Sequence, residues 1–125
     1  MEELQLKRIR FSKQVDIWLR VLKSRTGITP NLLCRIGLCL SIDEPGIPSN
    51  DAHPEDSNRE ISRPTLLGEH DAVFAALLRQ RVAEDGTLGE SSLDDQLRAH
   101  VHRGITLLAG RIKSLGDLGE QVRRP

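Results

Sequence analysis

The most constraining feature of the sequence is the junction at residues 26–31, Thr-Gly-Ile-Thr-Pro-Asn, which is followed by an apolar segment. Gly27 accepts the left-handed backbone that ends a helix, a conformation that is costly for residues with a Cβ. Thr29 is placed to cap the next helix with its hydroxyl, and Pro30 suits the first helical position, where its missing N–H is not needed. The junction predicts that one helix ends here and that another begins at once.

The segment that follows, LLCRIGLCLSI at residues 32–42, is apolar on nearly every side. A helix of this composition has to be enclosed by the rest of the chain or by a second copy of it. A second apolar feature is a seam in the last helix whose members step by three or four residues: Leu93, Leu97, Val101, Ile105, Leu108, Ile112 and Leu115. Gly104 and Gly110 interrupt this helix, and each either weakens it or marks the approach of another backbone. Because so much apolar surface exceeds what one small monomer hides, we expect a homo-oligomer, with a tetramer as one candidate.

The segment before the junction reads as an extended arm and an amphipathic helix. In residues 4–11, Ile9 and Phe11 fall on one side of an extended chain, and Arg8 and Arg10 on the other. Ser12 is placed to cap the helix that follows. The buried stripe of that helix is predicted to hold Val15, Trp18, Leu19 and Leu22. Its outer face is predicted to be basic, with Lys13, Arg20 and Lys23 interrupted by Asp16.

The segment between the two apolar helices is rich in proline, glycine, serine and acidic residues at positions 43–64. It predicts a long, exposed acidic loop that is a poor candidate for contact with phosphates. A helix is predicted from residue 65 to about 84, with Val73, Phe74, Leu77 and Leu78 as its stripe, and Ser91 or Ser92 caps the last helix. We therefore expect one domain over residues 1–125, mainly all-α, with about four helices. The tail after Gly116 is expected to fray.

Charge is distributed in blocks, although the whole chain is neutral. Residues 1–35 contain eight basic residues against three acids, a net charge of +5, and residues 36–96 have a net charge of −9. Residues 97–125 return to +4. Such blocks indicate either an anionic partner for the basic ends or mutual neutralisation on folding.

The composition offers little for catalysis or for a membrane. Four histidines are present, and His100 and His102 lie two apart on a helix, so they point to different sides. No phosphate-binding glycine loop, nucleophile elbow or zinc spacing occurs, and we expect no enzyme, no metal and no cofactor. Glu2 and Glu3 begin the chain without an apolar run, so we expect neither a signal peptide nor a membrane span.

Two cysteines, Cys34 and Cys39, are five residues apart on one apolar helix. This spacing is not typical of a disulfide or of a metal pair, which favours a reducing, cytoplasmic location. A reactive sulfur carrier needs an exposed thiol of low pKa, whereas a cysteine in an apolar helix is usually a small core residue. We favour the core interpretation.

The strongest functional pattern is a set of basic residues near the N-terminus. The candidate DNA contacts are Lys7, Arg8, Arg10, Lys13, Arg20 and Lys23. No acid interrupts the sequence from Lys7 to Lys13, and several such cations in an oligomer predict salt-sensitive phosphate binding. The alternative is an ordinary solvated face. Nothing in the sequence is typical of base recognition, and with only two phenylalanines and one tryptophan, base stacking is not expected to be the main activity.

Three stretches of the sequence resemble the DndE family, the small subunit of the bacterial DNA phosphorothioation (DNA sulfur modification) machinery. They are RIRFSK at residues 8–13, KSRTGITPNLLCR at residues 23–35 and TLLGEHDAVFAALL at residues 65–78. The resemblance implies a helical, oligomeric, non-catalytic protein that binds duplex DNA, including nicked duplex, without marked sequence preference. It also implies that the partners are the other modification subunits, which replace a non-bridging phosphate oxygen by sulfur.

Two alternatives to this function remain open from the sequence. An extended basic arm, an amphipathic helix, a turn and an apolar helix also match a ribbon-helix-helix repressor, in which Leu6, Arg8 and Arg10 face the major groove from a paired strand. A purely structural scaffold would have no affinity for DNA.

Overall fold

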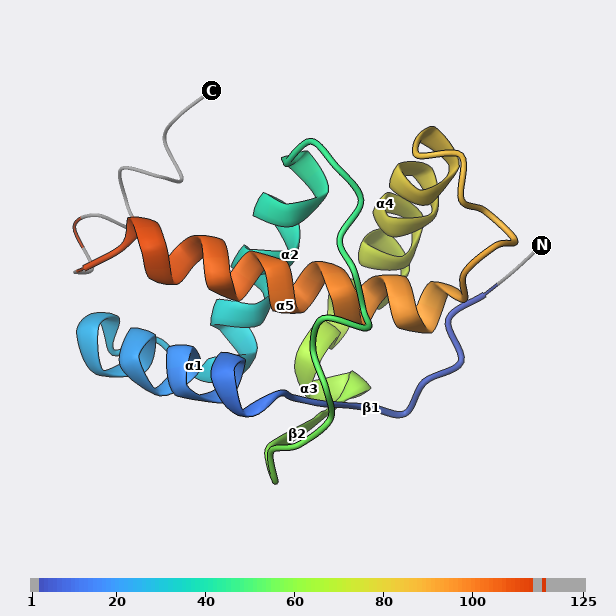
Figure 1. Cartoon of the computed structure of the whole chain (residues 1–125). Coiled ribbons are helices and arrows are strands. Elements are labelled where there is room, and N and C mark those ends of the chain that lie inside the picture. The colour runs from blue at the N-terminus through green and yellow to red at the C-terminus, as the bar shows by residue number, and fades with distance from the viewer. Residues whose placement is uncertain (1–2, 114–115, 117–125) are drawn as a thin grey trace.

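The computed structural model describes residues 3–113 and 116 of the 125-residue chain. Leu115 and the tail after Gly116 lie outside the described residues, so the predictions made for them stay predictions. The elements are β1 (Arg8–Arg10), α1 (Lys13–Thr26), α2 (Pro30–Asp43), β2 (Glu60–Ser62), α3 (Arg63–Leu67), a 3₁₀ turn (Gly68–His70), α4 (Asp71–Glu84) and α5 (Leu93–Arg111). The mainly helical class is therefore confirmed. Figure 1 shows α5 crossing the middle of the molecule, with α2 behind it, α1 alongside it and α4 near its beginning.

The junction between α1 and α2 forms largely as its sequence predicts. Gly27 has a φ of 74°, and its N–H donates to Lys23 O at 2.8 Å, which ends α1; Pro30 then begins α2. The prediction that Thr29 caps α2 with its side chain is wrong, because its hydroxyl makes no capping hydrogen bond. The hydroxyl of Thr26 instead joins the end of α1 to the linker, since it donates to Leu22 O and accepts from the N–H of Ile28.

Two glycines bring α2 and α5 into direct backbone contact. A Cβ on Gly104 would lie 1.9 Å from Gly37 O, so neither helix has room for a side chain at this crossing. This confirms one of the two interpretations of Gly104, whereas Gly110 has nothing within 4 Å of its Cβ position. The seam of α5 is also confirmed, because its six described apolar members are fully buried.

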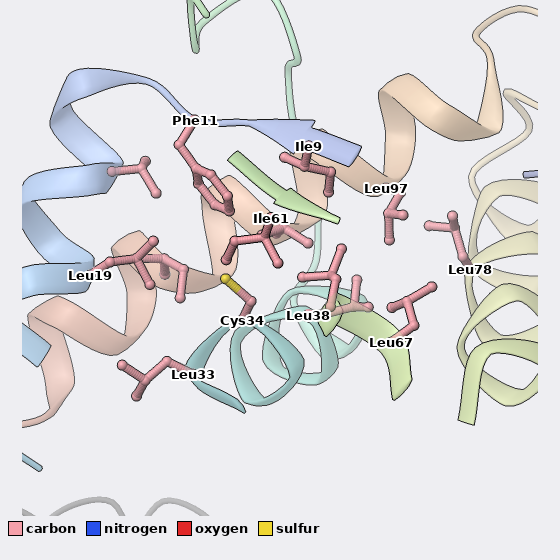
Figure 2. Packing of buried hydrophobic residues seen from close by; sticks show 14 of the residues in the cluster. Ile9, Phe11, Leu19, Leu33, Cys34, Leu38, Ile61, Leu67, Leu78 and Leu97 are labelled. Carbon is pink, nitrogen blue, oxygen red and sulfur yellow. The ribbon is translucent and has the colours of Figure 1, made fainter. Parts of the chain in front are cut away.

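The core lies between the strands and the helices α1 to α5. Figure 2 shows Ile9 and Ile61 of the strands, and Phe11 just after β1, pointing towards Cys34 and Leu38 of α2. The single chain encloses α2 only in part, so enclosure by a second copy, the other predicted alternative, stays a prediction. Its buried face holds Leu33, Cys34, Gly37, Leu38 and Ser41. The opposite side leaves Leu32 at 43% exposure and Cys39 exposed, with Ile36 and Leu40 half-buried.

The acidic segment after α2 is ordered rather than structureless. It crosses α5 (Figure 1), where Arg98 donates to Asn50 Oδ1 at 2.9 Å and Arg103 donates to Gly46 O at 2.7 Å. It then forms β2, which pairs antiparallel with β1 so that Arg10 lies opposite Glu60. The prediction missed this strand because its partner lies about fifty residues away in the sequence.

The single helix predicted after residue 65 is divided in two. Gly68 has a φ of 59° and follows α3, and α4 begins only at Asp71. The predicted stripe is partly wrong, since Val73 and Leu77 are 57% and 40% exposed. The buried positions of α4 are Ala75, Leu78, Arg81 and Val82. Ser92 caps α5 by accepting from the N–H of Asp95, as one of the two predicted serines.

Candidate nucleic-acid interface

The two strands form a ribbon with one buried and one exposed face. Ile9 and Ile61 face each other across the strands and are 1% and 7% exposed. The side chains of Arg8 and Arg10 are 62% and 48% exposed on the other face. This confirms the extended arm and its division into apolar and basic sides.

The outer face of α1 continues from the ribbon. Ser12 accepts from the N–H of Val15 at 3.2 Å and so caps α1, as predicted. Lys13, Arg20 and Lys23 are all exposed. Of the predicted inner stripe, Val15, Leu19 and Leu22 are fully buried, while Trp18 is half-buried.

An open pocket of about 520 Å³ joins α1 to the ribbon. Its walls are Lys13, Asp16, Arg20, Asp56, Ser57, Asn58, Arg59 and Glu60. Because Glu60 in this wall also contacts Arg8 and Arg10, four of the six predicted residues surround one surface. We call Arg8, Arg10, Lys13 and Arg20 the basic surface. Lys7 and Lys23 are exposed, but they do not line the pocket.

Two acidic groups from the segment after α2 lie within the basic surface, which the sequence pattern did not indicate. Glu60 Oε1 accepts from Arg10 at 2.8 and 3.1 Å, and Glu60 Oε2 lies 3.7 Å from Arg8. Asp56 accepts from the backbone N–H of Lys13 at 2.7 Å. The run from Lys7 to Lys13 is therefore uninterrupted in sequence but interrupted in space. The same segment also contributes Arg59, a basic residue of the pocket that the sequence analysis missed because only strand pairing brings it there.

Asp16 ties this segment to α1. Its side chain is 8% exposed, accepts hydrogen bonds from Arg59 and Ser57, and pairs with Arg20 at 3.1 Å. Burial alone would raise the pKa of this carboxyl, but the hydrogen bonds from Arg59 and Ser57 outweigh it, so the pKa lies below its usual value. Asp16 is thus a charged structural anchor beneath the pocket.

His102 and Arg98 of α5 form hydrogen bonds with the backbone of the ribbon and of the start of α1. His102 Nε2 accepts from the N–H of Ser12 at 3.2 Å, which makes Nδ1 the donor to Arg98 O at 2.9 Å. Arg98 Nε donates to Arg10 O at 2.9 Å. Burial, reinforced by the charge of Arg98, lowers the pKa of His102 to about 3, so this histidine is neutral.

The remaining histidine and cysteine candidates have structural positions. His100 is fully buried beside Ser41 of α2, with its Nδ1 2.8 Å from Ser41 Oγ, and burial lowers its pKa to about 4. Cys34 is a core residue, as predicted, and burial raises the pKa of its thiol to about 12. The core interpretation is wrong for Cys39, which is exposed, although partial burial raises its pKa as well. Within residues 3–113 and 116, no cluster of histidine, cysteine or acidic side chains is suited to hold a metal ion.

Two residues of the stretch 23–35 hold α3 through its backbone carbonyls. Arg35 donates from Nε to Leu66 O at 2.7 Å and from Nη2 to Thr65 O at 3.0 Å, and Asn31 donates to Thr65 O at 3.4 Å. A Cβ on Gly68 would lie 2.6 Å from Arg35 Nη2, so the glycine leaves room for this guanidinium.

Among the described helices, none combines the length and hydropathy needed to cross a bilayer.

These features define a class of small, mainly α-helical proteins in which a short ribbon and the helix after it carry a polar, largely basic surface. The model of the family described as "DNA sulphur modification protein DndE" matches residues 8–115. The chain belongs to the DndE family.

Solved structures agree with this assignment. The chain is similar to the crystal structure of DndE from Escherichia coli B7A, which is involved in DNA phosphorothioation modification, with 26% identity and a TM-score of 0.67 over 84% of this chain and 98% of that one. It also has the fold of a DndE mutant involved in DNA phosphorothioation, with 24% identity and a TM-score of 0.64 over 84% of this chain and 99% of that one. A comparison with curated proteins gives no match.

Proposed function

We propose that the chain is a non-catalytic subunit of the DNA sulfur modification machinery that grips duplex or nicked DNA through backbone phosphates. It acts in the cytoplasm as a homo-oligomer, beside the subunits that carry out sulfur transfer. The family and the phosphorothioation role of the Escherichia coli relative supply the context. The observation that carries the proposal is the basic surface, because Lys13 and Arg20 line one pocket and Arg8 and Arg10 contact Glu60 in its wall.

The side chains of this surface suit phosphates better than bases. Arginine and lysine neutralise phosphates whatever the sequence, which gives binding that depends on salt and little on sequence. Aromatic side chains that would stack on bases are not presented there, since Phe11 is fully buried and Trp18 is half-buried.

The repressor alternative needs β1 to pair with the same strand of a second copy. In this chain one edge of β1 is paired with β2. On the other side, Arg10 O accepts from Arg98, and the N–H of Ser12 donates to His102. An intermolecular ribbon would have to break one of these sets of hydrogen bonds, so the structure favours the phosphate-binding subunit.

The apolar side of α2 supports the homo-oligomer. Leu32, Ile36, Cys39 and Leu40 fall within about 100° of one another around the helix axis, since each residue turns the helix by about 100°. A continuous apolar stripe of this kind, left uncovered by the single chain, is typical of a surface that packs against another subunit. Association through α2 would place several basic surfaces on one particle.

A role without chemistry of its own is consistent with the groups that the fold buries. The neutral His102 and His100 are enclosed, and the raised thiol pKa of Cys34 leaves it protonated at neutral pH. Asp71, the acid beside His70, pairs with Arg63 at 2.7 Å. We therefore assign sulfur activation and nucleotide hydrolysis to partner subunits.

The direct test changes Arg8, Arg10 and Lys13 together to alanine. Because each phosphate contact contributes about 0.9 to the slope of log affinity against log salt, loss of three contacts in a protomer flattens that slope by up to about 3. The affinity falls about tenfold or more, and it falls equally for unrelated duplex sequences. Fluorescence anisotropy with scrambled duplexes at several salt concentrations measures both quantities.

A matched control removes the same charge elsewhere, through Arg25, Arg111 and Lys113 changed to alanine. Arg25 donates to Ile112 O, so these three residues lie around the end of α5. The control keeps the wild-type salt slope. An unchanged slope in the test variant contradicts the proposal, and an effect confined to one operator sequence favours the repressor.

A further inference from the structure

The register of the ribbon places one acidic side chain between two arginines. The N–H of Phe11 donates to Arg59 O and the N–H of Arg63 donates to Lys7 O, so the intervening pair of Arg10 and Glu60 is of the type without mutual hydrogen bonds. Side chains in such pairs lie closest together. Glu60 is thereby held directly opposite Arg10 and diagonally across from Arg8.

The carboxylate of Glu60 occupies the hydrogen-bonding edge of Arg10. Both Nε and Nη2 of Arg10 donate to Glu60 Oε1, at 3.1 and 2.8 Å. This is one of the two edges of the guanidinium that can chelate a phosphate or a carboxylate through two donors. A DNA phosphate and Glu60 therefore cannot use it together, and the negative charge of Glu60 also repels the phosphate.

The ion pair has little importance for the fold. The side chains of Arg8, Arg10 and Glu60 are 62%, 48% and 33% exposed, and pairs so open to water contribute little to stability. The ribbon is held by its backbone bonds and by the buried contact of Ile9 with Ile61. Asp16 differs, because it is buried and held by Arg59 and Ser57. Among the described residues, Glu60 pairs only with the two arginines.

We infer that Glu60 is an intramolecular competitor of the DNA backbone for Arg8 and Arg10, and that it limits the affinity of the basic surface for phosphates. The inference rests on the proposed DNA binding and adds a residue that sets its strength. Binding exchanges the carboxylate for a phosphate, so the two arginines contribute less than two free cations. Weak backbone binding lets a subunit move along DNA and be released, because non-specific affinity is set by the number of neutralised phosphates.

The test compares Glu60→Gln with wild type in binding scrambled duplex at several salt concentrations. The amide keeps the shape of the side chain but removes its charge, which releases both arginines. We expect affinity to rise about threefold to tenfold at low salt, and the salt slope to steepen by about 1, as for one additional phosphate contact. Glu84→Gln is the matched control, because Glu84 is exposed on α4 outside the pocket. It removes one negative charge, as Glu60→Gln does.

A double-mutant cycle separates local competition from net charge. In a chain that carries Arg8→Gln and Arg10→Gln, Glu60→Gln no longer raises the affinity, because the groups that it releases are absent. Equal affinities of Glu60→Gln and Glu84→Gln overturn the inference, and so does a gain that persists without the arginines. Either result leaves the proposed DNA binding in place if wild type binds. Failure of every variant, wild type included, to bind duplex at low salt overturns both.

Discussion

At the scale of single residues, Gly37 and Gly104 decide how closely α2 and α5 pack. The absent side chains allow the backbones to touch, with a Cβ on Gly104 placed 2.2 Å from Gly37 C and 1.9 Å from Gly37 O. Backbone atoms cannot move aside as a flexible side chain does, so any added atom separates the helices. The fully buried Leu38 and Ile105 lie next to the two glycines and share the consequence of such a shift.

Gly104→Ala is therefore expected to destabilise the protein by about 1–3 kcal/mol or more, since overpacking of a well-filled core has costs of this order. Gly110→Ala is the control, because its Cβ position is empty to 4 Å and alanine favours the helix by up to about 1 kcal/mol. Urea unfolding followed by circular dichroism measures both changes. Equal stability of Gly104→Ala and wild type would contradict the close contact.

At the scale of elements, the ends of several helices are held by residues from distant parts of the chain. The carbonyls at the end of α2 receive hydrogen bonds from Arg81 of α4 and Arg103 of α5, including Arg103 to Ser41 O at 2.7 Å. The last turn of α2 contains no basic residue of its own. At the corner between β1 and α1, His102 of α5 accepts the N–H of Ser12. These contacts make the helix ends depend on the tertiary fold.

The stability of the protein is expected to fall as the pH decreases from about 6.5 to 4. The pKa of an unfolded histidine is about 6.5, whereas burial lowers the pKa of His102 to about 3 and of His100 to about 4. Between these pH values the histidines bind protons in the unfolded chain but not in the folded chain. Their contribution to the free energy of unfolding is therefore fully present above pH 6.5 and is lost as the pH falls. Each histidine contributes a slope of up to about 1.4 kcal/mol per pH unit.

Urea midpoints between pH 7 and pH 4 measure this dependence. His102→Gln is expected to reduce the slope relative to wild type, because it removes a buried imidazole. The carboxyl groups of Asp16 and Asp71, whose pKa values are lowered from 3.8, add their own loss only near and below pH 4. A flat stability profile down to pH 5 would refute a neutral, buried His102.

Local chemistry accounts for the elements that the sequence predicted correctly. Ser12, Gly27, Pro30 and Ser92 act through neighbouring backbone groups, and the apolar seam of α5 follows the helix period. The missed features depend on distant partners: β2 on β1, the break at Gly68 on the guanidinium of Arg35, and the position of Glu60 on strand register. The basic residues and Asp16 were found from sequence, but Asp56 and Glu60 join them only once the segment after α2 folds back onto β1 and α1.

At the scale of the whole molecule, the uncovered stripe of α2 predicts association. We expect a multimer at micromolar concentration, held in part by Leu32 and Cys39, which the single chain leaves exposed. Leu32→Glu places a charge in this contact and is expected to shift the protein towards monomer. Leu88→Glu is the control, because Leu88 is 50% exposed outside α2. Sedimentation velocity resolves the species, and a monomeric wild type contradicts the expectation.

Association matters for function because it multiplies the number of basic surfaces that meet one duplex. Each protomer contributes a few phosphate contacts, and together they give the steep salt dependence of backbone binding. In every copy Arg8 and Arg10 would contact phosphates, and Glu60 of the same copy would compete for them.

The most direct test of this account is the affinity of the wild-type protein for intact, nicked and single-stranded DNA of scrambled sequence, measured against salt concentration. The account predicts linear plots of log affinity against log salt, with duplex slopes that correspond to several phosphates and are equal for unrelated sequences. The absence of duplex binding even at low salt, or affinity for one sequence alone, would contradict it.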